Sequence, residues 1–118
     1  MREVSPTEAE ALISAGAALL DTREPNEWAS GQLAGATSIR PAEVMTRVRA
    51  ELPDPERPVV VYCAHGHRSM VAAQQLALLG YRDVASMSGG IVRWRQEGRP
   101  VVTPAKEPSP RYARQLVM

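Results

Sequence analysis

Residues 59–69 read Val59-Val60-Val61-Tyr62-Cys63-Ala64-His65-Gly66-His67-Arg68-Ser69, and an apolar-periodic run follows as far as Leu79. Four residues of high strand propensity precede the cysteine and predict a buried strand, whereas the Ala- and Leu-rich run predicts a helix. The cysteine therefore lies where a strand ends and a helix begins. A tight loop there points unpaired backbone N–H groups at one spot, and the helix dipole adds partial positive charge. The pattern predicts an anion-binding loop around the thiol.

Cys63 is predicted to be a reactive thiol rather than part of the core. A free cysteine has a pKa of about 8.5, which such surroundings can lower to ~3.5–7.5. A drop of about two units requires ~2.7 kcal/mol, and charge-assisted hydrogen bonds supply ~1.5–3 kcal/mol each. The alternative is a buried structural cysteine, because free Cys is among the most buried residue types. The next six residues include two histidines and an arginine, a composition that does not suit a core.

The rest of the chain predicts strands that alternate with helices. Ser5-Pro6-Thr7-Glu8 is a capping box, so a helix is expected to run to about Ala15 and to end at Gly16. Further strands are expected at 17–21, 37–39 and 84–87, and further helices within 22–28, 41–52, 69–79 and 91–97. This alternation predicts an α/β domain with a parallel sheet. Ligands of such sheets bind at the carboxyl ends of the strands, where Cys63 lies.

Length, charge and cysteine usage exclude several classes of protein. A chain of 118 residues with 44% apolar content is expected to form one domain. The net charge of +1 argues against a nucleic-acid partner. No apolar run is long enough to span a membrane, and the first residues contain no signal-peptide core. A single cysteine cannot form an internal disulfide. These features predict a cytoplasmic protein with no membrane partner.

The loop and several separated motifs resemble the single-domain rhodaneses, and the resemblance covers roughly residues 3 to 102. Gln32 departs from it, since many members carry His there, but that position belongs to a structural segment. The matching residues are Tyr62-Cys63, Gly66, Arg68-Ser69, Ala72-Ala73, Leu76, Gly80-Tyr81, Asp83-Val84, Gly89-Gly90, Trp94, Gly98 and Pro100-Val101, and in the N-terminal half Leu20-Asp21, Arg23-Glu24, Glu27-Trp28, Gly31-Gln32-Leu33 and Gly35-Ala36.

The resemblance implies a fold and an activity. The fold is a rhodanese-like three-layer α/β domain over residues 1–102, with a central parallel sheet flanked by helices. The activity is sulfur transfer without a cofactor: the Cys63 thiolate takes sulfane sulfur from thiosulfate or a protein persulfide, and a second nucleophile removes it. The loop that would bind the anionic donor and the persulfide consists of Ala64, His65, Gly66, His67, Arg68 and Ser69.

Loop length separates this activity from two alternatives. Cys63 to Arg68 forms a six-residue loop, whereas relatives that resemble phosphatases and arsenate reductases carry one residue more. The smaller loop suits a sulfane sulfur better than a tetrahedral phosphate, which disfavours a phosphatase-like hydrolase. A non-enzymatic regulatory or redox-sensing module is the other alternative. An intact Cys63 together with Gly66 and Arg68 favours the enzyme.

Two other groups of residues have a chemical and a structural interpretation. Asp21, Arg23 and Glu27 could form a catalytic carboxylate pair with a guanidinium, but the residues at Asp21 and Arg23 brace the active-site loop in the resembled family, and bracing ion pairs are common. His65 and His67 could bind zinc with Cys63, but structural zinc sites take ligands from separated pairs. We therefore expect structural support from the first group and no metal, with the histidines bordering the entrance and favouring anionic donors.

The C-terminal residues 103–118 are expected to be a Pro-rich linker and the start of a possible following domain. Four prolines fall between Pro100 and Pro110, a composition typical of semi-rigid linkers. Residues 111–118 resemble the opening of the adenylyltransferases that activate sulfur-carrier proteins. An arbitrary basic tail is the alternative. The resemblance implies a sulfur-carrier protein as a partner, besides a small anionic donor or a persulfide donor protein.

Overall fold

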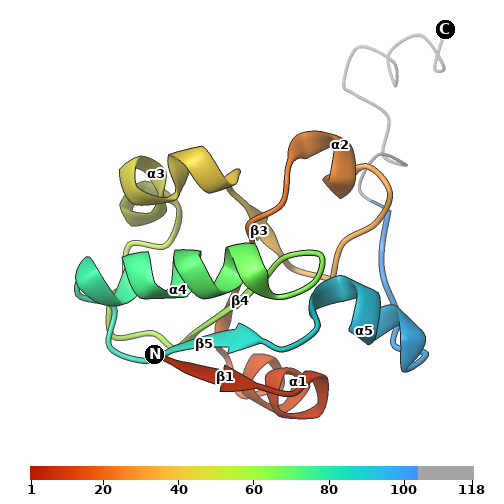
Figure 1. Ribbon diagram of the computed structural model, residues 1–118. Coiled ribbons are helices and arrows are strands. Elements are labelled where there is room, and N and C mark those ends of the chain that lie inside the picture. The colour runs from red at the N-terminus through yellow and green to blue at the C-terminus, as the bar shows by residue number, and fades with distance from the viewer. Residues whose placement is uncertain (104–118) are drawn as a thin grey trace, which may run out of the picture.

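The computed structural model describes residues 1–103 and contains a five-stranded, all-parallel sheet in the order β1-β5-β4-β2-β3 (Figure 1). The strands are β1 (Arg2–Val4), β2 (Ala18–Asp21), β3 (Thr37–Ser38), β4 (Val59–Tyr62) and β5 (Val84–Met87). The helices are α1 (Pro6–Ser14), α2 (Pro25–Trp28), α3 (Val44–Glu51), α4 (His67–Leu78) and α5 (Gly90–Gln96), with a 3-10 turn, η1 (Pro41–Glu43), before α3. The predicted α/β fold with a parallel sheet is confirmed.

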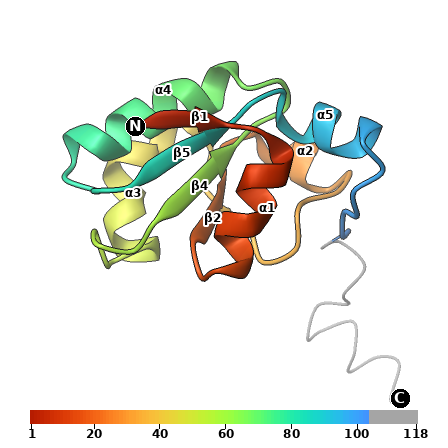
Figure 2. The same cartoon turned by 90° about the horizontal axis from the view of Figure 1, so that it is seen from below.

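The sheet lies between two layers of helices (Figure 2). Because side chains alternate along a strand, β4 sends Val59 and Val61 to one face and Val60 and Tyr62 to the other. The first face packs against α3 and α4, and the second packs against α1 and α5. All four residues of β4 are buried. The central strand that carries Cys63 at its end is therefore held from both sides.

Local sequence signals placed most of the helix ends to within one residue. The capping box forms: Ser5 Oγ accepts from the Glu8 N–H, and Glu8 Oε1 accepts from the Ser5 N–H, both at 3.1 Å. Gly16 and Gly80 follow their helices with φ of 107° and 97°, a region that favours glycine. The helix expected from residue 69 begins earlier, at His67, because Gly66 is its N-cap residue.

The first strand was not foreseen. β1 lies at the edge of the sheet and pairs in parallel with β5, with Arg2 opposite Ala85 and Val4 opposite Met87. Only Val4 of its three residues is buried, so the segment has no alternation that could predict a strand. Its pairing depends on a partner far away in the sequence.

Among residues 1–103, every helix is too short or too polar to cross a membrane.

Candidate active site

Cys63 directly follows β4, and α4 begins at His67, so the predicted strand–loop–helix arrangement is confirmed. The loop turns at Gly66, whose φ is 105°. A Cβ atom at this glycine would lie 3.3 Å from the backbone nitrogen of Gly89. The loop is therefore tight at both its own turn and the start of α5.

The sulfur atom of Cys63 is buried within a set of hydrogen-bond donors. The residue is 1% exposed. The Gly66 N–H donates to Cys63 Sγ at 3.0 Å, and Ser69 Oγ lies 3.5 Å from the sulfur. Burial alone raises the pKa of Cys63, but the Ser69 hydroxyl and the backbone N–H groups of Ser69, Gly66 and His65 outweigh it, so the pKa is lowered. This arrangement stabilises a thiolate.

The start of α5 holds the loop from the other side. The Ile91 N–H donates to the Cys63 carbonyl at 2.9 Å, and the Val92 N–H donates to the Ala64 carbonyl at 3.1 Å. Gly90 has a φ of 58°, and a Cβ atom there would lie 2.3 Å from the Ala64 carbonyl oxygen. Only a glycine permits this approach, so Gly90 contributes to the position of the loop that begins at Cys63.

Arg68 is paired with Glu27, which the sequence did not reveal. Arg68 Nη1 donates to Glu27 Oε1 at 2.7 Å, and Nη2 donates to Oε2 at 2.9 Å. Chiefly through these hydrogen bonds, the pKa of Glu27 is lowered to about 2, and that of Arg68 is raised. The Glu27 carboxylate therefore pairs with Arg68, because the chain brings α2 against the start of α4. Arg23 donates instead to the Glu27 backbone carbonyl at 3.3 Å.

Asp21 and Arg23 form a buried network behind the loop. Arg23 Nη2 donates to Asp21 Oδ2 at 2.8 Å and to the Gly31 carbonyl at 2.7 Å. The Tyr62 hydroxyl donates to Asp21 Oδ2 at 2.7 Å and accepts from the Leu33 N–H. Burial, together with the Asp21 charge and hydrogen bond, raises the pKa of Tyr62. These bonds join β2 to β4 just before Cys63.

Gln32 also belongs to this network. Its side-chain amide donates to Asp21 Oδ2 at 3.1 Å and to Ser38 Oγ. Gln32 is 7% exposed. The residue that departs from the motif therefore still provides a hydrogen-bond donor to the buried carboxylate, as an imidazole N–H could.

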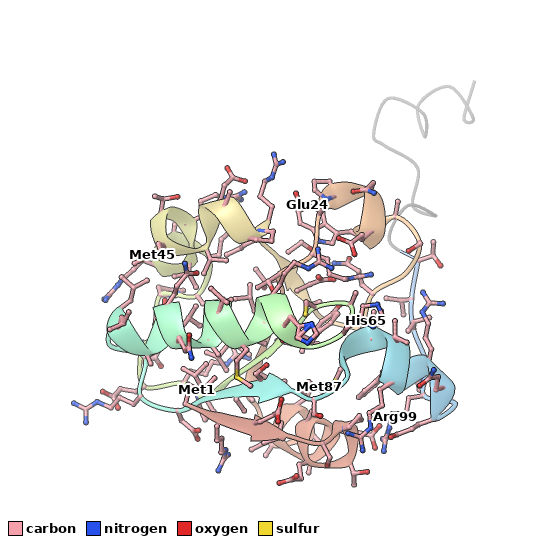
Figure 3. All side chains as sticks on the ribbon, viewed as in Figure 1. Met1, Glu24, Met45, His65, Met87 and Arg99 are labelled. Atoms are coloured by element: carbon pink, nitrogen blue, oxygen red, sulfur yellow. The ribbon has the colours of Figure 1, made fainter. Side chains whose placement is uncertain are left out.

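The two histidines are exposed on the loop surface. Figure 3 shows His65 at the end of the molecule where the loop meets the start of α5. Within residues 1–103, no cluster of three or more His, Cys, Asp or Glu side chains could hold a metal ion.

One buried hydroxyl near the sulfur was missed. Ser86 of β5 is fully buried, and its Oγ lies 2.8 Å from Ser69 Oγ. A serine within an otherwise apolar, four-residue buried strand was a signal in the sequence, because a buried hydroxyl needs a hydrogen-bond partner. The sequence alone could not tell that this partner was the residue beside the thiol.

An open cleft of ≈ 350 Å³ adjoins the loop between α2 and α5. Ala64 lies in its wall together with Glu27 and Arg95, among others. The cleft thus brings groups of both charges close to the loop that encloses the sulfur.

Comparison with known proteins identifies the relatives of this chain. Residues 5–97 match the model of the rhodanese-like domain. A thiosulfate sulfurtransferase (GlpE) of Pseudomonas entomophila strain L48 is 36% identical over 94 residues, which are 80% of this chain and 84% of that protein. The structure of the human single-domain sulfurtransferase TSTD1 superimposes with a TM-score of 0.73 at 28% identity, covering 80% of this chain and 96% of that one.

A third similar structure, from Rhodopseudomonas palustris CGA009, is described as a protein of unknown function and possible tyrosine phosphatase. It superimposes with a TM-score of 0.76 at 28% identity and covers 86% of this chain and 85% of its own.

Proposed function

The chain belongs to the rhodanese-like domain family, and on that premise we propose that it is a sulfurtransferase in which Cys63 carries sulfane sulfur as a persulfide. The observation that carries the proposal is the surroundings of Cys63 Sγ, which accepts from the Gly66 N–H at 3.0 Å and has the Ser69 hydroxyl 3.5 Å away. Aimed donors favour the thiolate, which is the nucleophilic form of cysteine.

The reaction has two steps. In the first, the Cys63 thiolate attacks the outer sulfur of thiosulfate, a new S–S bond forms, and sulfite leaves with the electron pair of the broken bond. A persulfide donor reacts in the same way and releases a thiolate. In the second step, a nucleophilic acceptor attacks the outer sulfur of the Cys63 persulfide and regenerates the thiolate. The loop N–H groups stabilise the anionic sulfur in both forms.

Arg68 is proposed to bind the anionic part of the donor. Arg68 is the second residue of α4. Two nitrogen atoms of its guanidinium already donate hydrogen bonds to the Glu27 carboxylate. The positive charge available to an incoming anion is therefore smaller than that of a free arginine. The histidines His65 and His67 are exposed beside it.

The proposed partners are a small anionic donor such as thiosulfate, or a persulfide donor protein, and a sulfur-carrier protein as acceptor. The relative from P. entomophila supports the first, since it is a thiosulfate sulfurtransferase. The carrier rests on the resemblance of residues 111–118 to adenylyltransferases, and those residues lie outside the described part of the chain.

The test is the mass of the protein after exposure to thiosulfate. Because Cys63 is the only cysteine, we expect the wild-type protein to gain one sulfur atom and to transfer it to cyanide. Cys63→Ser keeps the size of the side chain but cannot hold sulfane sulfur, so it should fold and show neither result. Substantial transfer by Cys63→Ser would overturn the mechanism.

The same samples distinguish the alternatives. A wild-type protein that gains no sulfur from thiosulfate or from small persulfides would support a regulatory module. Hydrolysis of an aryl phosphate, lost in Cys63→Ser, would support the phosphatase suggested for the R. palustris protein. We expect no such hydrolysis, because the six-residue loop suits a sulfane sulfur better than a tetrahedral phosphate.

A further inference from the structure

We infer that Ser86 is a positioning residue for the Cys63 thiolate: its hydroxyl donates to Ser69 Oγ and thereby leaves the Ser69 proton available to the sulfur. The inference rests on the proposed role of Cys63 as a nucleophile and adds a residue from β5 to the site. It concerns how the thiolate is stabilised, which can be measured without sulfur transfer.

The three side chains form a short buried row. Cys63 Sγ lies 3.5 Å from Ser69 Oγ, which lies 2.8 Å from Ser86 Oγ. Both serines are 0% exposed and Cys63 is 1% exposed. The sheet brings them together, because Ser86 pairs with Val61 on β4, two residues before Cys63, while Ser69 lies in the first turn of α4.

The direction of the bond between the serines follows from counting protons. Each hydroxyl has one proton and two acceptor lone pairs. Among residues 1–103, Ser69 Oγ is the only hydrogen-bond partner of the Ser86 hydroxyl. If Ser69 donated to Ser86, the proton of Ser86 would be buried without an acceptor, which is unfavourable. Ser86 therefore donates to Ser69.

The proton of Ser69 then has two possible acceptors, the Gly66 carbonyl at 3.2 Å and Cys63 Sγ. When Cys63 is a neutral thiol, its S–H can donate to the second lone pair of Ser69 Oγ, and Ser69 donates to Gly66. When Cys63 is ionised, the Ser69 hydroxyl can turn its proton to the sulfur without losing the bond from Ser86. The pair of serines thus satisfies both protonation states and favours the thiolate.

The charged groups around Cys63 are not altered by a change at Ser86. Arg68 faces the site from α4 with Glu27 of α2 against it, and the Asp21–Arg23 pair lies at the end of β2. His65 and His67 are exposed in the loop. Residues 84–92 of β5 and the start of α5 contain no ionisable side chain. A shift caused by Ser86→Ala would therefore report the loss of the hydroxyl.

The experiment measures the rate of alkylation by iodoacetamide against pH in the otherwise wild-type protein, whose single cysteine makes the signal unambiguous. For Ser86→Ala we expect a raised thiolate pKa, so that alkylation below the wild-type pKa slows by about three- to tenfold. The limiting rate at high pH should stay unchanged. Ser69→Ala should raise the pKa at least as much.

A double variant distinguishes positioning from a merely structural role. If Ser86 acts through Ser69, then Ser69→Ala combined with Ser86→Ala should have the pKa of Ser69→Ala alone. Additive shifts would overturn the inference, as would an unchanged pKa in Ser86→Ala.

Ser86→Thr and Ser86→Val provide a second, shape-matched pair that differs in the hydroxyl. Only the valine variant should raise the pKa of Cys63, and equal pKa values in the two variants would also contradict the inference.

Thermal unfolding of each variant verifies folding. Alkylation reports the thiolate even in a protein that takes no sulfur from thiosulfate, so this inference and the proposed function can fail separately.

Discussion

Arg68 and Glu27 illustrate how one residue's role depends on its partner. An arginine in a predicted anion-binding loop suggests a free cation for the substrate, but here a bidentate carboxylate binds it at 2.7 and 2.9 Å. Bidentate pairs fix the plane of the guanidinium. Glu27 therefore orients Arg68 and also reduces the net charge beside the thiolate.

The ion pair should make stability depend on pH in acid. The pKa of Glu27 is lowered from 4.5 to about 2, so its stabilising contribution is complete above about pH 4.5 and is lost as the pH falls towards 2. Glu27→Gln should lower the free energy of unfolding by about 1 kcal/mol at pH 7, since both side chains are partly exposed. The loss should disappear near pH 2. Urea unfolding at pH 7, 4 and 2.5 measures it.

Glu51→Gln is the matched control, because it removes the carboxylate from an exposed pair with Arg47 on α3. It should change the free energy of unfolding little at any of these pH values. Equal losses in the two variants at pH 7 would show that Glu27 and Arg68 form an ordinary surface pair.

Among the elements, α5 has a role beyond covering the sheet. Its first N–H groups have no acceptor within the helix and instead donate to the carbonyls of Cys63 and Ala64. This requires the helix to start almost in contact with the loop, and Gly90 makes that possible. The two glycines at the start of α5 thus let the last helix contact the loop that begins at Cys63.

Gly90→Ala should displace the loop and abolish sulfur transfer. Its Cβ would lie 2.3 Å from a backbone oxygen, where no flexible side chain can move away. We expect a loss of stability of more than about 2 kcal/mol, from overpacking added to an unfavourable φ. Chemical denaturation and the thiosulfate assay measure the two effects.

Gly98→Ala is the control for backbone conformation. Gly98 has a φ of 74°, but a methyl group added there would meet open space, with nothing within 4 Å. The variant should lose only about 1 kcal/mol and keep its activity. If both variants behaved alike, the contact between α5 and the loop would not matter for function.

At the scale of the whole molecule, the segment after α5 closes the domain. Gln32 and Val102 exchange two backbone hydrogen bonds of 2.7 Å, and Trp94 Nε1 donates to the Pro100 carbonyl at 2.9 Å. These bonds attach residues 100–102 to α5 and to the turn that follows α2. We therefore expect residues 100–102 to be part of the folded unit and its boundary to lie just beyond them.

Two truncations test this boundary. A chain that ends at residue 103 should unfold at the same urea concentration as the full chain, because all of these bonds remain. A chain that ends at Arg99 loses the Gln32–Val102 bonds and leaves Trp94 without an acceptor, so it should be about 1–3 kcal/mol less stable. Destabilisation of the longer truncated chain would show that the unit extends beyond residue 103.

Much of this protein could be predicted from short stretches of its sequence. The strand before Cys63, the helix after it and the capping box at Ser5 depend on residues within a few positions of one another, because backbone propensity, capping and turn formation are local. The alternation of strands and helices then led to a parallel sheet, with the cysteine at the carboxyl end of a central strand.

Only the tertiary structure determined which distant residues meet at the sulfur. Glu27 reaches Arg68 from 41 positions away, Ser86 reaches Ser69 from 17, and β1 pairs with β5 across most of the chain. The order of the strands decides these contacts, and it is set by how all the apolar faces pack together at once. The sequence by itself determined that a thiol would stand in a loop between a strand and a helix; the packing of β5, α2 and α5 around that loop decided which hydroxyl, carboxylate and backbone N–H groups surround it.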